Sequence, residues 1–556
     1  MAGYRLCRPA EPFGGLMADI LRQSSLPDPF RAAPSAGWKV LDASTLAEDR
    51  DIAADVAIVG TGAGGGTAAE ILSGAGLEVV MIEEGPLATS SNFRMREADA
   101  YPQLYQESAS RKTKDKAINI LQGRCVGGGT TVNWTSSFRT PVATLEHWAT
   151  AFGLAGFGAD DLAPWFDRME RRLGIAPWPV APNENNDTLR RGAQALGISV
   201  SAIRRNVKGC WNIGYCGMGC PTNAKQSMLV TTIPAALERG AMLLTRTRAL
   251  KLEHVNGRVS ALACVGLDAR GTDPTLRRIT VRAKTFIAAG GAIGTPALLL
   301  RSNVSDPHGV VGKRTFLHPT VVSAALMSER VDGFSGAPQT IYSDHFLGDD
   351  LSGPIGYKLE VPPIHPVLAA ITLPGHGVAH ARWMRDLPHM QVIIALLRDG
   401  FHPDSPGGTV TLRGDGTPLL DYPLNDYFWD GARRALATMT EIQFAAGART
   451  VMPVHASGVT YTRWPDARAG LAALPLAPLV TPVVSAHVMG GCPIGPDVRR
   501  AAVDPSGRYH HLDNLYVLDG SLFPTSVGAN PQLSIYAMTA KLASGLVTAL
   551  GRGPSG

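Results

Sequence analysis

The sequence predicts an α/β protein with one parallel sheet built from three separated pieces of chain, and a second domain inserted between them. Three apolar runs carry this prediction, because each is short and leads into glycine: residues 56–59, 285–289 and 515–518. A short, continuous apolar run bounded by a glycine turn is typical of a strand that is buried on both faces of a parallel sheet.

The first run opens a strand–helix–strand unit. Residues 56–59 lead into Gly60-Thr61-Gly62-Ala63-Gly64-Gly65, after which small and apolar residues over 67–73 predict a helix. Residues 78–82 then predict a second strand, which ends at Glu83. This order and length are those of a β-α-β unit with a glycine turn.

The glycines of this turn predict a dinucleotide site. Gly60 allows the chain to turn tightly, Gly62 lets the backbone approach a pyrophosphate, and Gly65 lets helix and strand pack closely. Glu83 stands 23 residues after Gly60, where an acid binds ribose hydroxyls, and it is preferred to Glu84 because it directly follows the apolar run. The motif alone does not separate FAD from NAD. The cofactor contacts expected in this unit are Gly60, Gly62, Gly64, Gly65 and Glu83.

The other two pieces repeat the order of strand and glycine. Residues 285–289 run into Gly290-Gly291 before a predicted helix over 295–300, and residues 515–518 run into Asp519-Gly520. A helix over about 534–550 closes the chain. Between these pieces, residues 408–412 predict an antiparallel strand before a turn at 414–416.

These elements divide the chain into an extension and two domains. Residues 1–50 are expected to be an N-terminal extension with a short helix around 16–22. Residues 51–140, 225–320 and 481–556 are expected to form the nucleotide-binding domain. Residues 141–224 and 321–480 are expected to form the inserted domain.

Composition argues against several other classes of protein. The chain has 556 residues, of which 18% are charged, and its formal net charge of +5 includes no block of Lys or Arg, so nucleic-acid binding is not expected. No apolar run is long enough to span a bilayer, and no secretory signal is evident. Seven cysteines are too few for a disulfide framework, which favours a cytoplasmic protein. No metal site is expected, because His510-His511 lack further ligands at suitable spacing.

Four further segments resemble the glucose–methanol–choline (GMC) oxidoreductases. Residues 123–133, GRCVGGGTTVN, resemble the first signature of that family, and residues 289–296, AGGAIGTP, resemble the second. Residues 487–495, HVMGGCPIG, resemble the segment around the catalytic histidine, and residues 519–531 resemble the C-terminal flavin-binding segment. The order and spacing of these segments agree with the family over residues 55–550.

The resemblance implies a Rossmann-like FAD-binding domain with an inserted substrate domain built on an antiparallel sheet. It implies that residues 127–130 lie along the pyrophosphate and flavin, with Asn133 near the ring. Some members attach FAD through a histidine just before that asparagine, but Val132 stands here, so noncovalent FAD is expected. The further residues implied to bind FAD are Arg124, Gly128, Gly129, Thr130, Asn133, Ala289, Asp519, Gly520, Asn530 and Pro531.

The resemblance also implies His487 as the active-site base and Asn530 as the second polar residue. An alcohol releases hydride only as its oxygen gains negative character, and an imidazole near neutral pH can accept its proton. Asn530 can donate an amide N–H to the same oxygen and fix the carbon against flavin N5. His318-Pro319 also recurs in the family and is interpreted as structural. The expected reaction is oxidation of a fairly apolar alcohol to an aldehyde or ketone by hydride transfer to FAD.

Two other functions on the same fold stay open. A lyase resembling the flavin-containing hydroxynitrile lyases would keep FAD but show no flavin reduction by any alcohol. The catalytic subunit of an electron-transfer dehydrogenase complex would react with artificial acceptors and not with O₂. The expected partners are therefore a small alcohol substrate and either O₂ or a quinone or redox protein as acceptor.

A cluster of cysteines adds a subfamily signal. Residues 216–220, CGMGC, together with Lys225-Gln226-Ser227, look most like the long-chain alcohol oxidases and related bacterial enzymes. Cys210, Cys216 and Cys220 have three interpretations: reduced thiols, a redox disulfide, or a three-cysteine iron–sulfur cluster.

Overall fold

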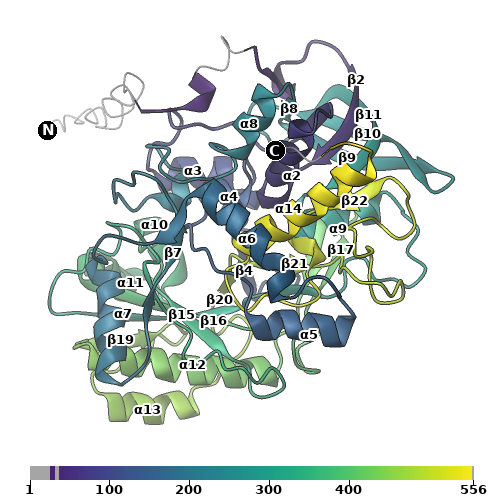
Figure 1. The fold of residues 1–556 in the computed structure, drawn as a ribbon. Coiled ribbons are helices and arrows are strands. Elements are labelled where there is room, and N and C mark those ends of the chain that lie inside the picture. The colour runs from purple at the N-terminus through teal and green to yellow at the C-terminus, as the bar shows by residue number, and fades with distance from the viewer. Residues whose placement is uncertain (1–25, 32–36, 554–556) are drawn as a thin grey trace, which may run out of the picture.

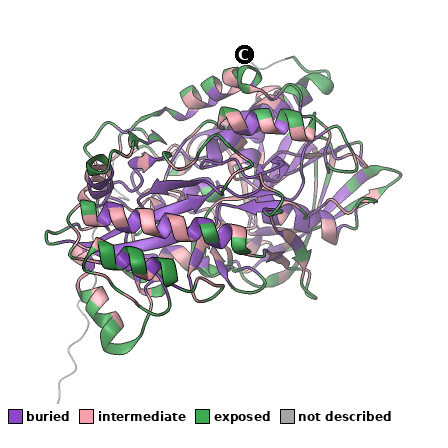
Figure 2. Cartoon of the chain, turned by 90° about the horizontal axis from the view of Figure 1, so that it is seen from below, coloured by how far each residue is buried: buried purple, intermediate pink, exposed green. Residues whose placement is uncertain are grey.

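Two large sheets, each covered by helices, make up the computed structural model, which describes residues 26–31 and 37–553 (Figure 1). The short helix expected around residues 16–22 lies outside the described residues. Figure 2 shows that buried residues concentrate in the strands and the inward faces of helices, while exposed residues occupy loops and outer helix faces.

The first sheet joins the three pieces of chain that the sequence predicted. β2 pairs in parallel with β3 on one side and with β11 on the other, and β22 extends the sheet from the end of β11. The order of the sheet is β1-β8-β3-β2-β11-β10-β9, with β22 beside β11. Its strands are β1 (Lys39–Asp42), β2 (Arg50–Val59), β3 (Val79–Ile82), β8 (Met242–Thr245), β9 (Thr247–Val255), β10 (Arg258–Leu267), β11 (Pro274–Ala288) and β22 (Leu515–Val517). The predicted parallel pairing is confirmed for the strands from β1 to β11 and for β22, while β10 pairs antiparallel with β11 and with β9.

One strand of this sheet comes from the segment expected to be an extension. β1 pairs in parallel with β8, and Lys39 stands opposite Met242. The strand has only four residues, half-buried or exposed, so it lacks the continuous apolar run by which β2, β3, β11 and β22 were recognised. Residues 39–42 are therefore part of the first sheet.

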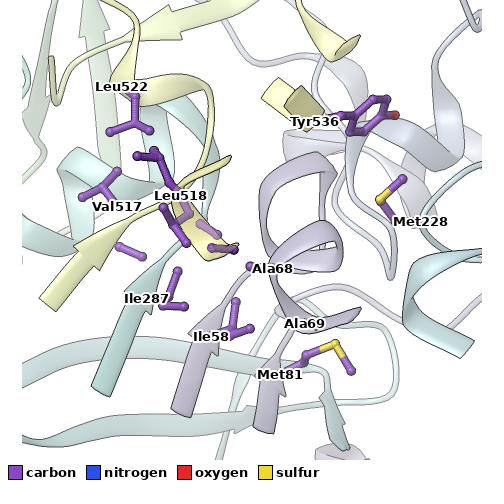
Figure 3. Packing of buried hydrophobic residues seen from close by; sticks show 14 of the residues in the cluster. Ile58, Ala68, Ala69, Met81, Met228, Ile287, Val517, Leu518, Leu522 and Tyr536 are labelled. Atoms are coloured by element: carbon purple, nitrogen blue, oxygen red, sulfur yellow. The ribbon is translucent and has the colours of Figure 1, made fainter. Parts of the chain in front are cut away.

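Helices pack closely on the first sheet because their contact residues are small. Helix α2 (Ala63–Gly74) begins at the glycine turn after β2 and contacts α14 (Gln532–Ala549) and α8 (Thr232–Glu238). Figure 3 shows Ala68 and Ala69 of α2 beside the strand residues Ile58 and Met81. Helix α6 (Ala159–Leu173), from the segment expected in the inserted domain, also packs against α14.

The second sheet is mainly antiparallel, as expected for the substrate domain. Its order is β4-β20-β13-β16-β15-β14-β6, with β19 paired to β13. Its strands are β4 (Ile118–Ile120), β6 (Ser201–Ala202), β13 (Thr320–Leu326), β14 (Ile341–Ser343), β15 (Tyr357–Glu360), β16 (Met390–Leu397), β19 (Thr450–Pro453) and β20 (Val483–Ser485). β4 and β20 belong in sequence to the pieces expected in the nucleotide-binding domain, so these two pieces contribute strands to both sheets.

Each face of the second sheet packs against helices. Helix α12 (Asp426–Ala445) packs on one face and contacts α7 (Glu184–Ala195) and α13 (Trp464–Ala473). The other face forms a separate apolar cluster with residues of α10 (Pro366–Thr372) and the segment after it. The predicted strand at residues 408–412 is β17 (Thr409–Leu412), which forms a hairpin with β18 (Pro418–Asp421) and packs on α9 (Gly291–Arg301) rather than joining this sheet.

Short elements complete the described chain. Two small antiparallel pairs join β5 (Ile175–Pro177) to β7 (Arg204–Asn206) and β12 (Thr315–Leu317) to β21 (Val488–Gly490). The remaining α-helices are α3 (Glu97–Leu104), α4 (Gly129–Val132), α5 (Val142–Phe152) and α11 (Gly377–Arg385). The 3-10 turns are η1 (Pro29–Arg31), η2 (Ala43–Thr45), η3 (Gln106–Ala109), η4 (Cys216–Met218), η5 (Leu387–His389) and η6 (Gly520–Leu522). Among the described residues, no helix has the length and apolarity needed to cross a membrane.

Replacement of Gly65 by alanine is expected to destabilise the fold. A Cβ at this position would lie 1.9 Å from the carbonyl oxygen of Gly60, so α2 would be forced away from β2. We expect a loss of about 2–3 kcal/mol in the free energy of unfolding, measured by denaturant titration. Gly545→Ala is the matched control, because nothing lies within 4 Å of its built Cβ. Equal stability of the two variants would contradict this close packing.

Candidate active site

A cavity of about 1290 Å³ is lined by residues of both sheets and holds almost every residue that the sequence singled out. The predicted residues that line it are Gly60, Gly62, Gly64, Glu83, Arg124, Gly128, Gly129, Thr130, Asn133, Ala289, His487, Asp519, Gly520, Asn530 and Pro531. Gly65 does not line the cavity and instead packs α2 against the turn at Gly60.

Two glycine loops meet at the first sheet's side of the cavity. A Cβ on Gly128 would lie only 2.8 Å from the Cα of Gly62, and Gly128 has a φ of +52°. The Gly127 N–H donates a hydrogen bond to Thr61 Oγ1 at 3.0 Å, which fixes the loops together. The cavity wall here is bare backbone, the surface that a pyrophosphate needs for close approach.

The acid at the end of β3 is buried and held by the protein. Glu83 Oε2 accepts hydrogen bonds from the N–H (3.2 Å) and hydroxyl (2.6 Å) of Thr61, and Oε1 accepts one from the Gly85 N–H (2.9 Å). Burial raises the pKa of Glu83, and these hydrogen bonds oppose the shift. Because a carboxylate has about four acceptor sites, Oε1 keeps one free for a ribose hydroxyl.

Glu84 and Arg124 pair with each other. Arg124 Nε donates to Glu84 Oε1 at 3.1 Å, and Arg248 Nε donates to the same oxygen at 3.0 Å. Burial raises the pKa of Glu84, but the charges of Arg124 and Arg248 outweigh it, and the pKa falls below its usual value. A second contact ties Arg124 to the Gly271 carbonyl, so its guanidinium is fixed at the cavity wall.

Asp519 organises the loops at the carboxyl ends of the strands. Its Oδ2 accepts hydrogen bonds from the Gly291 N–H (2.7 Å) and the Thr295 hydroxyl (2.6 Å), while Oδ1 accepts from the N–H and hydroxyl of Ser521. These four bonds use all the acceptor sites of a carboxylate. Asp519 therefore joins α9 to η6, and only its backbone is left for a contact with a cofactor.

His487 lies opposite His318 because of the pairing between β12 and β21. Leu317 stands opposite Val488 in that antiparallel pair, so the adjacent histidines face each other with 3.0 Å between their Nδ1 atoms. The Gly528 N–H donates to His318 Nε2 at 3.2 Å. His318, which the sequence analysis interpreted as structural, therefore contacts both the imidazole of His487 and the loop that carries Asn530.

Both histidines lie where protonation is unfavourable. Burial, followed by the positive charge of Lys358, lowers the pKa of His487 to about 3. Burial and the neighbouring His487 hold the pKa of His318 well below its usual value. Both rings are therefore neutral at neutral pH, and His487 remains half-exposed to the cavity.

Asn530 lies against a buried charged pair on β15. Its Nδ2 donates to Glu360 Oε2 at 3.2 Å, and Lys358 Nζ lies 3.8 Å from Glu360 Oε1. Burial raises the pKa of Glu360 and lowers that of Lys358 to about 8, while their mutual attraction opposes both shifts. Asn530 Oδ1 is buried and has no hydrogen-bond partner among the described residues. Lys358 and Glu360 were not predicted from the sequence, because β15 was not recognised as a strand.

The second sheet supplies an apolar wall. Side chains of β13 and β16 that face α10 line the cavity, joined by residues of α10 itself. They are Val322, Ala324, Met390, Val392, Ile394, Leu396, Leu368 and Ala369. A substrate in this part of the cavity would contact apolar side chains where it faces the second sheet.

The cysteine cluster contains free thiols. Cys210, Cys216 and Cys220 are half-buried and form no disulfide. Within the part of the chain that the structure describes, no three His, Cys, Asp or Glu side chains are placed to hold a metal ion. Lys225 Nζ donates to the carbonyls of Thr131 (2.8 Å) and Cys216 (2.7 Å) and so ties the cysteine loop to the segment after Gly129.

Comparison with known proteins shows the family. Residues 101–320 and 403–539 match the GMC oxidoreductase family, and the chain is 31% identical over 501 residues to an uncharacterized GMC-type oxidoreductase of Sinorhizobium fredii, covering 90% of this chain and 95% of that one. The chain belongs to the GMC oxidoreductases. It is accordingly an FAD-binding oxidoreductase that acts on CH–OH donors, and the recognition made from the sequence motifs is confirmed.

Relatives with a named activity include a long-chain-alcohol oxidase of Arabidopsis thaliana, which is 29% identical over 521 residues, or 90% of this chain and 68% of that one. Among solved structures, pyridoxine 4-oxidase from Mesorbium loti has a TM-score of 0.63 at 19% identity, over 88% of this chain and 98% of that one. A formate oxidase of Aspergillus oryzae has a TM-score of 0.64 at 14% identity, over 91% and 99%. These likenesses confirm the fold.

Replacement of Gly62 by valine is expected to yield folded protein without flavin. The Cβ itself has room, with the nearest atom, Gly128 Cα, 3.9 Å away, but the valine methyl groups would fill the gap between the two glycine loops. Purified variant and wild type are compared by flavin absorbance per chain and by circular dichroism. Retention of the full flavin content by the variant would show that the loops do not cradle the cofactor.

Proposed function

We propose that this enzyme oxidises an apolar alcohol to an aldehyde or ketone, with His487 taking the alcohol proton and Asn530 orienting the alcohol oxygen. The observation that carries the proposal is one cavity lined by both residues, by the glycine loops and by the apolar wall of β13 and β16. When bound, FAD supplies the hydride acceptor. The side chains described here bind, orient and exclude water.

The fit of the cavity to FAD supports a noncovalent cofactor. The bare backbone between Gly62 and Gly128 suits a pyrophosphate, and Glu83 keeps a free acceptor site for a ribose hydroxyl. Val132, at the position where some relatives carry a histidine, is buried and has no nucleophilic atom. The cofactor is held by backbone contacts and hydrogen bonds alone.

The hydrogen-bond network around His318 sets the proton position in the histidine pair. The Gly528 N–H makes His318 Nε2 an acceptor, so neutral His318 carries its proton on Nδ1 and donates it to His487 Nδ1. Neutral His487 then holds its own proton on Nε2. To take the alcohol proton at Nε2, the pair must shift to the other tautomer and give up the Gly528 hydrogen bond, which costs about 1–3 kcal/mol.

The low pKa of His487 makes proton uptake transient. Burial and the charge of Lys358 disfavour the imidazolium, so the ring is neutral at neutral pH, accepts the alcohol proton only after the tautomer shift, and gives it up readily. Asn530 uses one amide N–H on Glu360 and has a second for the alcohol oxygen. The two side chains thus hold the carbinol by its oxygen and present its carbon to the cofactor.

The walls of the cavity support an apolar substrate. A sugar or polyol in contact with β13 and β16 would leave hydroxyls without partners, at about 1–3 kcal/mol each. An alkyl chain gains about 0.8 kcal/mol for each buried CH₂. We therefore propose a long-chain or similarly apolar alcohol, and O₂ as the electron acceptor, since the relatives with a named activity given above are oxidases.

Anaerobic mixing with alcohols of increasing chain length is the direct test. We expect the flavin to bleach with long-chain alcohols, more slowly with short ones and not with glucose, and to recover when air is admitted. If the flavin colour recovered only after a quinone was added, the electron acceptor would be a quinone and not O₂. Absence of bleaching with every alcohol would overturn the proposed function.

His487→Ala is expected to retain FAD and to lower the rate constant of flavin reduction at least about 100-fold, because among the described residues that line the cavity His487 is the one histidine. Stopped-flow absorbance measures the rate, and flavin content per chain is recorded for the same samples. His308→Ala, an exposed histidine outside the cavity, is the control. A native reduction rate in His487→Ala would exclude it as the base.

Lys358→Met is expected to move the acidic limb of flavin reduction to higher pH. The charge of Lys358 helps hold the pKa of His487 at about 3, so its removal raises that pKa and the neutral base is lost sooner as the pH falls. The difference should fade toward neutral pH, because burial alone keeps the pKa of His487 below its usual value and the base is then neutral in both proteins. Rate constants from pH 4 to 9 are compared with those of Lys284→Met, a surface control 81% exposed. Coinciding acidic limbs would contradict the electrostatic role.

A further inference from the structure

The segment that holds α10 and the first part of α11 is unusual for its lack of charge. Residues 361–381 contain no Asp, Glu, Lys or Arg, although 18% of the whole chain is charged. Val367, Ile371 and Val378 are nevertheless 44%, 65% and 72% exposed. Single exposed apolar side chains need no explanation, but a group of them on an uncharged segment marks an interaction surface. These three residues are called the apolar lip.

The apolar lip is held in place by contacts to the rest of the molecule. Glu97 of α3 accepts hydrogen bonds from the N–H groups of Val367 (2.7 Å) and Leu368 (2.9 Å), which caps α10. His380 Nε2 bonds the Ala370 carbonyl at 3.0 Å and so joins α11 to α10. Trp383 packs against the apolar cluster beneath. The outward apolar side chains therefore belong to an anchored helical hairpin.

The same hairpin is a wall of the substrate cavity. Leu368, Ile371 and Leu373 line the cavity, so one side of α10 faces the proposed substrate while the other faces solvent. Leu479, from the segment after α13, also lines the cavity and is 65% exposed. Apolar surface thus continues from the interior of the cavity to the outside of the molecule.

Basic residues stand next to the apolar lip. Arg382 and Arg385 are exposed at the C-terminal end of α11. The acid paired with Arg385 is Asp386, at the long distance of 3.9 Å. Apolar side chains bordered by arginines match the interface of a bilayer that carries anionic headgroups.

We propose that the α10–α11 hairpin docks on the surface of an anionic phospholipid bilayer, from which the alcohol enters the cavity beneath α10. The inference rests on the proposed function for the nature of the substrate. Val367 and Val378 enter the acyl boundary, and Arg382 and Arg385 contact headgroup phosphates. Docking would spare a poorly soluble alcohol the passage through water.

Flotation of the holoenzyme with vesicles tests the docking without turnover, so its failure is distinguishable from failure of the proposed reaction. Vesicles of phosphatidylcholine alone are compared with vesicles that also contain phosphatidylglycerol. We expect binding to the anionic vesicles. Val367→Ser/Val378→Ser should lower it about tenfold, and Leu276→Ser, a control on β11 that is 91% exposed, should leave it unchanged. Each of Arg382→Gln and Arg385→Gln should lower it about fivefold, equivalent to about 1 kcal/mol.

Activity gives a second readout. The double valine variant should reduce its flavin at the native rate with a short, water-soluble alcohol, because neither valine lines the cavity. With a long-chain alcohol held in anionic vesicles, its rate should fall in parallel with binding. Absence of wild-type binding to anionic vesicles would overturn the proposal. So would unchanged flotation of the valine variant accompanied by loss of self-association on gel filtration, because the apolar lip would then be a contact between copies of the chain.

Discussion

The structure depends on backbone touching backbone at the carboxyl ends of the parallel strands. A Cβ on Gly60 would lie 2.3 Å from the Ala289 carbonyl oxygen, and one on Gly64 would lie 1.8 Å from that of Leu518. These contacts bring together the ends of β2, β11 and β22, three strands from distant parts of the sequence. Only chain without side chains can pack this closely. The same glycines therefore allow the parallel strands to come together and form the bare backbone wall of the cavity.

A buried pair of opposite charges in the second sheet lies beside Asn530. Lys358 and Glu360 form a buried pair on β15. Asn530 donates a hydrogen bond to Glu360, and the charge of Lys358 lowers the pKa of His487. In such surroundings a charge acts over a longer distance than in water. Burial lowers the pKa of the proposed base, and the charge of Lys358 lowers it further without direct contact, while His318 makes the direct contact with its ring.

The residues that line the cavity could be predicted from the sequence better than the residues that contact and orient them. Strand runs, glycine turns and family-like segments identified His487 and Asn530 without a structure. His318 was interpreted as structural, because nothing local shows that β12 pairs with β21 and sets the two imidazoles 3.0 Å apart. β4 and β20 were missed because three-residue strands carry little periodicity, and neither leads into the glycine turn that made the equally short β22 recognisable.

The sequence by itself determined the local features: where the chain turns on glycine, which strands are buried on both faces, and which segments resemble the motifs of the family. These features depend on neighbouring residues and can be read along the chain. Only the tertiary structure decided the contact between His318 and His487, the charge of Lys358 that lowers the pKa of His487, and the exposure of the apolar lip beside the cavity. These three features depend on contacts between residues far apart in sequence. Burial and strand register create those contacts.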